Sequence, residues 1–268
     1  MQKASRERVA AASARVPAAE LAAQIAQSPA PPRLALGDGG FDVIAELKLR
    51  SPSQGALALP AVDPAARLAS YARGGAAAVS VLTEPTRFDG SLEHLQLAAQ
   101  TLTPLGVPVM RKDFLVDPYQ LLEARVRGAS GALLILKLVD RAVLTAMLDC
   151  AAELGLFVLL EAFDAADLDA AAELAAERRA REEQVLMGLN CRNLETLAID
   201  PRRFGALRER LPGDWPAVAE SGIESPRDAA AVAALGYRLA LIGTSLMKHN
   251  DAARATAALI EAGRRAVA

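Results

Sequence analysis

The stretch GALLILKLVDRAVLTAMLDCAAELGLFVLLE, from Gly131 to Glu161, decides the fold class of this chain. Two short apolar runs, GALLIL and LFVLLE, flank the segment RAVLTAMLDCAAELG, which has a helical period and closes on a glycine, as helices often do. The apolar runs do not alternate with polar residues, which is typical of parallel strands covered by helices on both faces. The stretch therefore predicts a strand, a helix and a second parallel strand.

The same unit recurs along the chain. The other apolar runs are DVIAEL from Asp42, AAVSVL from Ala77, VPVM from Val107, QVLMGL from Gln184, PAVAE from Pro216 and LALIG from Leu239. Eight units in about 230 residues fit an α/β fold of the (β/α)8 TIM barrel type, whose typical length is about 250 residues. The alternative is an open doubly wound sheet, which would carry a dinucleotide fingerprint after its first strand, and none is present.

We expect residues 1–268 to form a single domain, with an N-terminal helical extension over 1–40 and the barrel over 41–268. The first thirty residues are rich in Arg, Ala and Ser, which is also the composition of transit peptides, but two glutamates argue against that alternative. The spacing of Val9, Ala12, Val16, Leu21 and Ile25 predicts an apolar stripe on helices that are interrupted near Pro17.

Composition excludes several function classes. The net charge of -2 argues against a nucleic-acid partner. Two histidines and two distant cysteines leave little room for a transition-metal site or a disulfide framework. No apolar run is long enough to span a membrane. We expect a cytoplasmic protein without metal, nucleotide cofactor or membrane partner; a monomer is compatible with the sequence, and the oligomeric state stays open.

Polar residues gather where the predicted strands end, which is where TIM barrels place their chemistry. They are Glu46 and Lys48; Ser80 and Thr83; Arg111, Lys112 and Asp113; Lys137; Glu161; Asn190 and Arg192; Glu220 and Ser221; Gly243 and Thr244. The chain holds 25 arginines but five lysines, and three of these lysines are in this set. A lysine ammonium can shift its pKa, which a guanidinium cannot, so lysines facing glutamates indicate acid–base catalysis.

Small residues follow the last two predicted strands, in AESGI and IGTSLM. Glycines there let backbone N–H groups approach an anion, and these loops form the usual phosphate site of the fold. The sequence therefore predicts an enzyme that carries out acid–base chemistry on a phosphorylated small molecule.

Several segments together resemble the indole-3-glycerol-phosphate synthase family of tryptophan biosynthesis. They are IAELKLRSPSQG, SVLTEPTRFDGSLEHL, PVMRKDFLVDPYQ, GALLILKL, LLEAFD, GLNCRNL, AESGI and LIGTSLM, in this order along the barrel. The resemblance implies a lyase that converts 1-(2-carboxyphenylamino)-1-deoxyribulose 5-phosphate to indole-3-glycerol phosphate, with loss of carbon dioxide and water.

The resemblance also implies a role for individual residues. Lys112 is the general acid that protonates the ribulose carbonyl, Glu161 is the base, and Lys48 and Glu46 assist proton transfer and hold the substrate carboxylate. The division of the acid role between Lys48 and Lys112 over the two steps stays open. The other implied sites are Asn190, Arg192, Glu220 and Ser221 for the carboxylate and sugar hydroxyls; Lys48, Gly222, Gly243 and Thr244 for the phosphate; Phe88, Phe114, Leu133, Ile135 and Leu194 for the aromatic ring; and Ser51 and Pro52 in a mobile loop over the substrate. Cys191 is expected to be buried and not reactive.

Two alternatives stay open. One is a Schiff-base lyase acting on a sugar phosphate, with Lys137 or Lys112 as the nucleophile. The other is a catalytically lapsed paralogue that acts as a binding protein, against which the intact acid–base set argues.

Overall fold

The predicted apolar runs form the strands of a closed barrel. The computed structural model describes residues 1–48, 50–51, 55–56, 63–178, 181, 183–193 and 196–268. Within these residues the eight barrel strands are β1 (Asp42–Leu47), β4 (Ala78–Leu82), β5 (Val109–Lys112), β6 (Gly131–Ile135), β7 (Phe157–Ala162), β8 (Val185–Asn190), β9 (Ala217–Glu220) and β10 (Leu239–Ile242). Neighbouring strands are parallel and close in the order β1-β10-β9-β8-β7-β6-β5-β4, with β4 beside β1. The predicted TIM barrel is confirmed.

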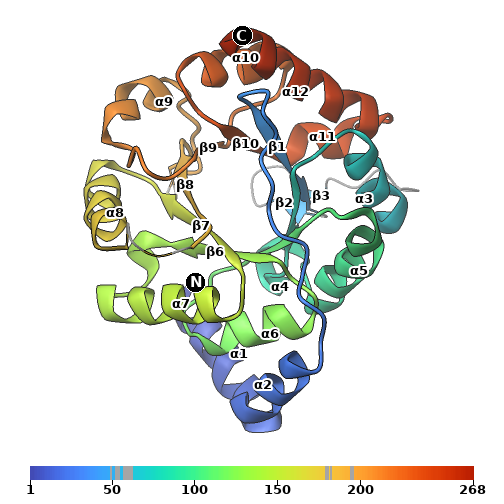
Figure 1. The fold of residues 1–268 in the computed structure, drawn as a ribbon, viewed down its shortest axis with the longest axis vertical. Helices are drawn as coiled ribbons and strands as arrows, with labels where there is room; N and C mark the ends of the chain where they lie inside the picture. Colours follow the sequence, from blue (N-terminus) through green and yellow to red (C-terminus); the bar gives the residue numbers. More distant parts are fainter. Residues whose placement is uncertain (49, 52–54, 57–62, 179–180, 182, 194–195) are drawn as a thin grey trace.

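Helices surround the strands, as Figure 1 shows. They are α3 (Pro64–Arg73), α4 (Pro85–Phe88), α5 (Leu92–Leu102), α6 (Tyr119–Val126), α7 (Arg141–Glu153), α8 (Ala165–Arg178), α9 (Arg202–Ala206), α10 (Pro226–Ala234), α11 (Thr244–Lys248) and α12 (Ala252–Val267), with 3-10 turns η1 (Thr103–Leu105), η2 (Leu136–Leu138) and η3 (Arg208–Arg210). Several begin at a polar cap: the side chains of Asp63, Asp140 and Ser225 accept backbone N–H groups at the starts of α3, α7 and α10. A short antiparallel pair, β2 (Arg50–Ser51) and β3 (Gly55–Ala56), follows β1.

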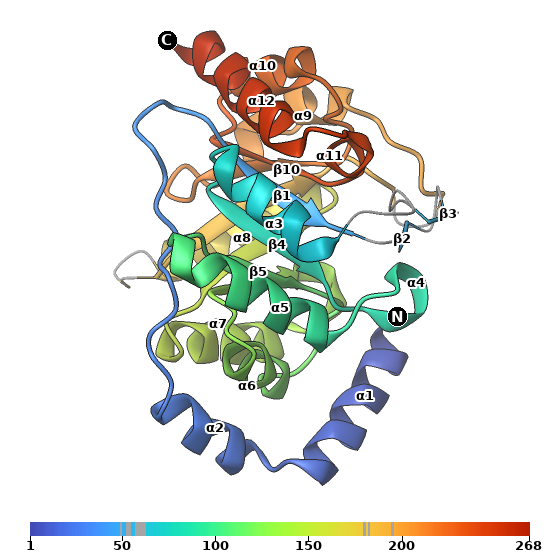
Figure 2. The ribbon, with the colours of Figure 1, turned by 90° about the vertical axis from the view of Figure 1, so that its right-hand side faces the viewer.

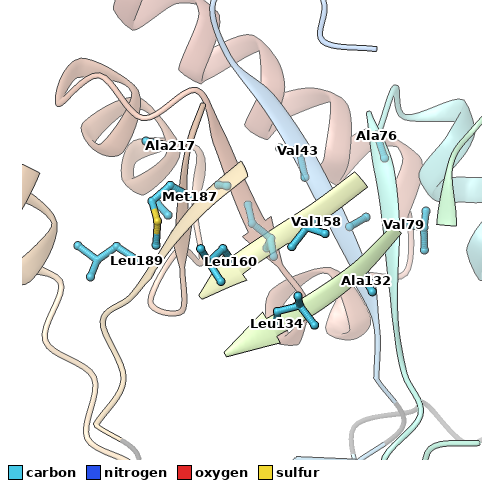
Figure 3. Close-up of a cluster of buried hydrophobic side chains, with 14 of the residues drawn as sticks. Val43, Ala76, Val79, Ala132, Leu134, Val158, Leu160, Met187, Leu189 and Ala217 are labelled. Atoms are coloured by element: carbon cyan, nitrogen blue, oxygen red, sulfur yellow. The ribbon is translucent and has the colours of Figure 1, made fainter. Parts of the chain in front are cut away.

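Two apolar layers hold the barrel together. Successive side chains of a strand point to opposite faces, so Val158 and Leu160 of β7 pack outward against the helices (Figure 3), while Leu159 packs inside the barrel. The interior layer also contains Ile44 and Met110, both fully buried. Because apolar side chains fill the interior, the inward-facing polar groups of the strands are concentrated at their C-terminal ends.

The N-terminal extension contains two helices, α1 (Gln2–Arg15) and α2 (Ala18–Ala26). The predicted break is confirmed, because Pro17 is the N-cap of α2. In α1 the fully buried residue is Ser5, whose Oγ donates to the carbonyl oxygen of Phe114 at 2.5 Å, while Val9 and Ala12 of the expected apolar stripe are half-buried. Polar contacts and these half-buried apolar side chains both hold α1 against the barrel, and Figure 2 shows its first turn beside α4.

Among the described residues, no helix is both long enough and apolar enough to cross a membrane.

Candidate active site

The predicted site residues converge on one cavity of about 190 Å³ at the C-terminal ends of the barrel strands. Those that line it are Glu46, Lys48, Phe88, Lys112, Phe114, Leu133, Ile135, Glu161, Asn190, Arg192, Glu220, Ser221, Gly222, Gly243 and Thr244. They come from all eight barrel strands or from the segments that follow them. Parallel strands bring these ends together although the residues are far apart in the sequence.

Lys112, at the end of β5, lies between two buried carboxylates. Its Nζ is 3.0 Å from Oε2 of Glu220 on β9 and 3.6 Å from Oε1 of Glu161 on β7. Asn190, at the end of β8, donates from Nδ2 to the same Oε1 of Glu161 at 2.7 Å. These contacts fix an ammonium donor and a carboxylate acceptor within a few ångströms of each other, which is the arrangement that general acid–base catalysis needs.

A second ion pair joins two residues of the first strand and its end. Nζ of Lys48 lies 2.8 Å from Oε1 of Glu46, whose side chain is buried. Gly243 makes room for this pair, because a Cβ atom on Gly243 would overlap Oε1 of Glu46. The glycine in the IGTSLM segment therefore leaves space for a neighbouring carboxylate, in addition to any role in binding an anion.

The buried charges shift one another's pKa. Burial lowers the pKa of Lys112, but the carboxylates of Glu161, Glu220 and Glu46 outweigh this effect and raise the pKa above its usual range. Burial raises the pKa of Glu46, but the ammonium groups of Lys48 and Lys112 bring it below its ordinary value. For Glu220, burial and the charge of Glu161 raise the pKa to about 8 in spite of Lys112. Neighbouring carboxyl groups with opposite pKa shifts are typical of acid–base sites.

An apolar slot lies across the cavity from the small-residue loops. Phe88, at the end of α4, and Phe114, which follows β5, have ring centroids 6.5 Å apart. Leu133 and Ile135 of β6 also line the cavity. Around the barrel, β5 and β9 are separated by three strands in either direction, so Phe114 follows the strand opposite the one that precedes Gly222. The cavity thus has an aromatic end and a small-residue end.

The loops after β9 and β10 have the features of an anion site. Ser221 and Gly222 both have positive φ, of 69° and 73°, so this turn has a left-handed backbone. Beside Thr244, Oγ of Ser245 is buried and has no hydrogen-bond partner among the described residues. Buried hydroxyl groups normally have a partner, so this one is suited to a ligand.

Some strand-end residues do not belong to the cavity. Nζ of Lys137 pairs with Asp164 at 2.9 Å and Asp167 at 3.3 Å, and Lys137 is absent from the described cavity lining. Arg111 turns toward the helices, where it donates to the carbonyl oxygen of Gln120 at 2.8 Å. The sequence places these residues at strand ends correctly, but only packing shows which way each side chain points.

Three further predictions concern neighbouring loops. Ser51 belongs to β2, whereas Pro52 and Leu194 lie outside the described residues. Cys191 is buried in the outer apolar layer, as expected.

The structure adds polar lining residues that the sequence prediction missed, namely Glu84, Arg87, Glu224 and Ser245. Glu84 directly follows the strand end that contains Thr83, and Ser245 directly follows Thr244, so extending each strand-end segment by one residue would have found both. Arg87 immediately precedes Phe88, but sequence gives no sign that α4 turns it toward the cavity.

Among the residues that the structure describes, no group of three or more His, Cys, Asp or Glu side chains is arranged to hold a metal ion.

Comparison with known proteins identifies the family. The indole-3-glycerol phosphate synthase family model matches residues 1–259. Indole-3-glycerol phosphate synthase of Mycobacterium leprae is 40% identical over 263 residues, covering 97% of this chain and 92% of that protein. The enzyme of the same name from Nocardioides sp. is 46% identical over 213 residues, covering 79% of this chain and 77% of that protein.

The solved structures show the same fold at low identity. The 3-hexulose-6-phosphate synthase from Salmonella typhimurium has a TM-score of 0.63 at 12% identity, with 84% of this chain and 99% of that chain covered. The match of the family model over nearly the whole length and the two curated relatives lead to one conclusion. The chain belongs to the indole-3-glycerol phosphate synthase family.

Proposed function

We propose that this chain converts 1-(2-carboxyphenylamino)-1-deoxyribulose 5-phosphate to indole-3-glycerol phosphate, carbon dioxide and water, a step of tryptophan biosynthesis. The observation that carries the proposal is the position of Lys112 between Glu161 and Glu220 in a cavity with an aromatic end and a small-residue end. The substrate has the matching parts, since an aromatic acid and a phosphate lie at its two ends.

In the first step, a bond forms between the ring carbon that bears the carboxylate and the carbonyl carbon of the ribulose chain. The carbonyl oxygen takes a proton, and Lys112 is the donor. Its ammonium form is the dominant one, because the surrounding carboxylates raise its pKa. The bond to the carboxylate then breaks, carbon dioxide leaves, and the bond's electrons restore the aromatic ring.

In the second step, the new hydroxyl group leaves as water after taking another proton, and a base accepts a proton from the newly formed ring. Glu161 is suited to be this base because its carboxylate is buried in the cavity and oriented by Asn190 at 2.7 Å. The Lys48 and Glu46 pair, 2.8 Å apart, is suited to assist the proton transfers. Accepting and donating groups close to the reacting atoms are worth roughly a hundredfold or more each in rate.

The chemical character of the two ends of the cavity indicates how the substrate would bind. The ring of the substrate would pack between Phe88 and Phe114, over the aliphatic side chains of β6. The phosphate would bind at the small-residue end, to Gly222, Gly243 and Thr244, with the Lys48 ammonium as its cation. Asn190, Arg192, Glu220 and Ser221 line the space between the two ends and would bind the sugar hydroxyls and the carboxylate.

The test is an assay of the purified protein with this substrate, which follows indole fluorescence and confirms indole-3-glycerol phosphate by mass. We expect product in the absence of added metal or nucleotide. A folded protein that leaves the substrate unchanged would contradict the proposal and would support the lapsed paralogue instead.

The structure disfavours the Schiff-base alternative. A nucleophilic lysine must be neutral, but ion pairs with Asp164 and Asp167 raise the pKa of Lys137 against the effect of burial. The pKa of Lys112 is raised as well. Treatment with borohydride in the presence of substrate should leave the mass of the protein unchanged, whereas a covalent adduct would favour the lyase alternative.

A further inference from the structure

Arg87 is a cavity-lining cation that the reaction scheme above does not use. It is the third residue of α4, directly before Phe88, and both residues line the cavity. The backbone N–H of Arg87 donates to Oε2 of Glu84 at 2.7 Å, which fixes this turn at the mouth of the barrel.

Within the part of the chain that the structure describes, no side chain neutralises the charge of Arg87. Among the described residues, no acceptor lies within hydrogen-bond or ion-pair distance of its guanidinium group. Both lysines that line the described cavity are already in ion pairs, Lys48 with Glu46 and Lys112 with Glu161 and Glu220, whereas Arg192 donates to the carbonyl oxygen of Leu197 at 3.0 Å. A ligand anion could therefore pair with Arg87 without breaking an internal ion pair.

The position of Arg87 indicates which kind of anion it would bind. α4 follows β4, which is next to β5 in the barrel. Phe88, the last residue of α4, lies at the aromatic end of the cavity. The small-residue loops follow β9 and β10, and β1 separates β10 from β4. Arg87 thus lies beside the aromatic slot, where an acid group attached to a bound aromatic ring would be found.

We propose that the guanidinium group of Arg87 is a further contact of the carboxylate on the aromatic ring of the substrate, in addition to the strand-end residues assigned above, and that it selects for carboxylated rings. A planar guanidinium can donate two parallel hydrogen bonds to one carboxylate. This inference rests on the proposed function, because it takes the substrate of that reaction as the ligand.

The chemistry of the substrate predicts which kinetic constant Arg87 controls. The carboxylate leaves as neutral carbon dioxide, so a contact with its charge stabilises bound substrate and is lost as decarboxylation proceeds. Interactions of this kind lower KM without raising kcat. Arg87→Gln should raise KM about tenfold, the scale of one charge-assisted hydrogen bond at a partly solvated site, and should leave kcat within about threefold.

Two stable ligands test the contact directly. One is the alcohol formed by reducing the ketone of the substrate, which cannot cyclise, and the other is the same alcohol without the ring carboxylate. By calorimetry, Arg87→Gln should weaken binding of the carboxylated alcohol about tenfold and change binding of the other less than about twofold. Arg265→Gln, an exposed arginine of α12 that pairs with Glu261, removes the same charge away from the site and should change neither.

The outcomes separate this inference from the proposed function. If Arg87→Gln weakens the binding of both ligands equally, Arg87 acts on the phosphate or on the overall potential. If the Kd of neither ligand changes, Arg87 makes no contact with them. Either result overturns the inference, while wild-type turnover still supports the proposed reaction. A wild-type protein that neither forms product nor binds the carboxylated alcohol overturns both.

Discussion

A carboxylate oxygen of Glu220 occupies the space in which a side chain of Gly188 would lie. A Cβ atom on Gly188 would overlap Oε1 of Glu220 and would come within 3.1 Å of Cδ1 of Leu159. The other oxygen of the same carboxylate is 3.0 Å from Nζ of Lys112. The missing side chain at Gly188, on β8, therefore allows the Glu220 carboxylate on β9 to reach the proposed general acid.

We expect Gly188→Ala to lower kcat by at least roughly tenfold, because displacing a group that positions the acid by an ångström or less has effects of this size. The same substitution at Gly213, where a Cβ atom would meet no other atom within 4 Å, is the control and should leave kcat unchanged. Steady-state kinetics and thermal unfolding of both variants check this. Wild-type kcat in a folded Gly188→Ala variant would contradict the positioning role.

Replacing the proposed general acid should have a larger effect. Lys112→Ala is expected to lower kcat by at least roughly a hundredfold, the scale of one general acid. Lys112→Arg should not restore activity, because a guanidinium group does not release its proton. Lys3→Ala, whose side chain is 92% exposed on α1, is the matched control. Turnover near that of the wild type in Lys112→Ala would refute the assigned role.

The raised pKa of Glu220 predicts a pH dependence of stability. Burial and Glu161 raise this pKa from 4.5 to about 8, so between these values the folded protein holds a proton that the unfolded chain has released. The contribution of this group to the free energy of unfolding therefore falls as the pH rises through that window. Because Glu220→Gln does not titrate, its Tm relative to the wild type should increase from about pH 5 to about pH 8.

The exposed residue Glu209 of η3 supplies the control, as Glu209→Gln should keep a constant Tm difference over the same range. Parallel Tm curves for Glu220→Gln and the wild type would show that Glu220 has no raised pKa in the folded protein.

The N-terminal helix is expected to support the mouth of the barrel. Arg8 of α1 lies 2.7 Å from Oδ1 of Asp113, next to Lys112, and 3.6 Å from Oε1 of Glu84, which caps α4. We propose that residues 1–40 form one domain with the barrel for this reason. Arg8→Ala should reduce the free energy of unfolding by about 1 to 2 kcal/mol, since it leaves a buried carboxylate with fewer partners.

KM should rise in Arg8→Ala as well, because Phe88 and Phe114 adjoin the two loops that Arg8 connects. Chemical denaturation and kinetics measure both effects, and Arg6→Ala, on the exposed side of the same helix, is the comparison. Equal values for the two variants would show that α1 is not coupled to the site.

Sequence was sufficient for the barrel because the signal there is local. The apolar run from Asp42 to Leu47 coincides with β1, and the other runs differ from their strands by at most two residues at an end. The run ending at Met110 is the instructive case, since β5 continues through Arg111 and Lys112. When the end of a strand forms a site, its charged residues interrupt the apolar pattern, and the pattern alone then places the end of the strand too early.

Strand ends and motifs also placed the proposed acid–base residues in one cavity, because parallel strands in a closed barrel must bring their C-terminal ends together. Side-chain direction was decided by the tertiary structure. Neighbours across the barrel determine whether a strand-end cation faces the cavity, as Lys112 does, or pairs outside it, as Lys137 does. Three further features depend on atoms that are distant in sequence: the space that Gly188 leaves for Glu220, the contacts of α1, and the lack of a partner for Arg87 among the described residues. No local pattern records them.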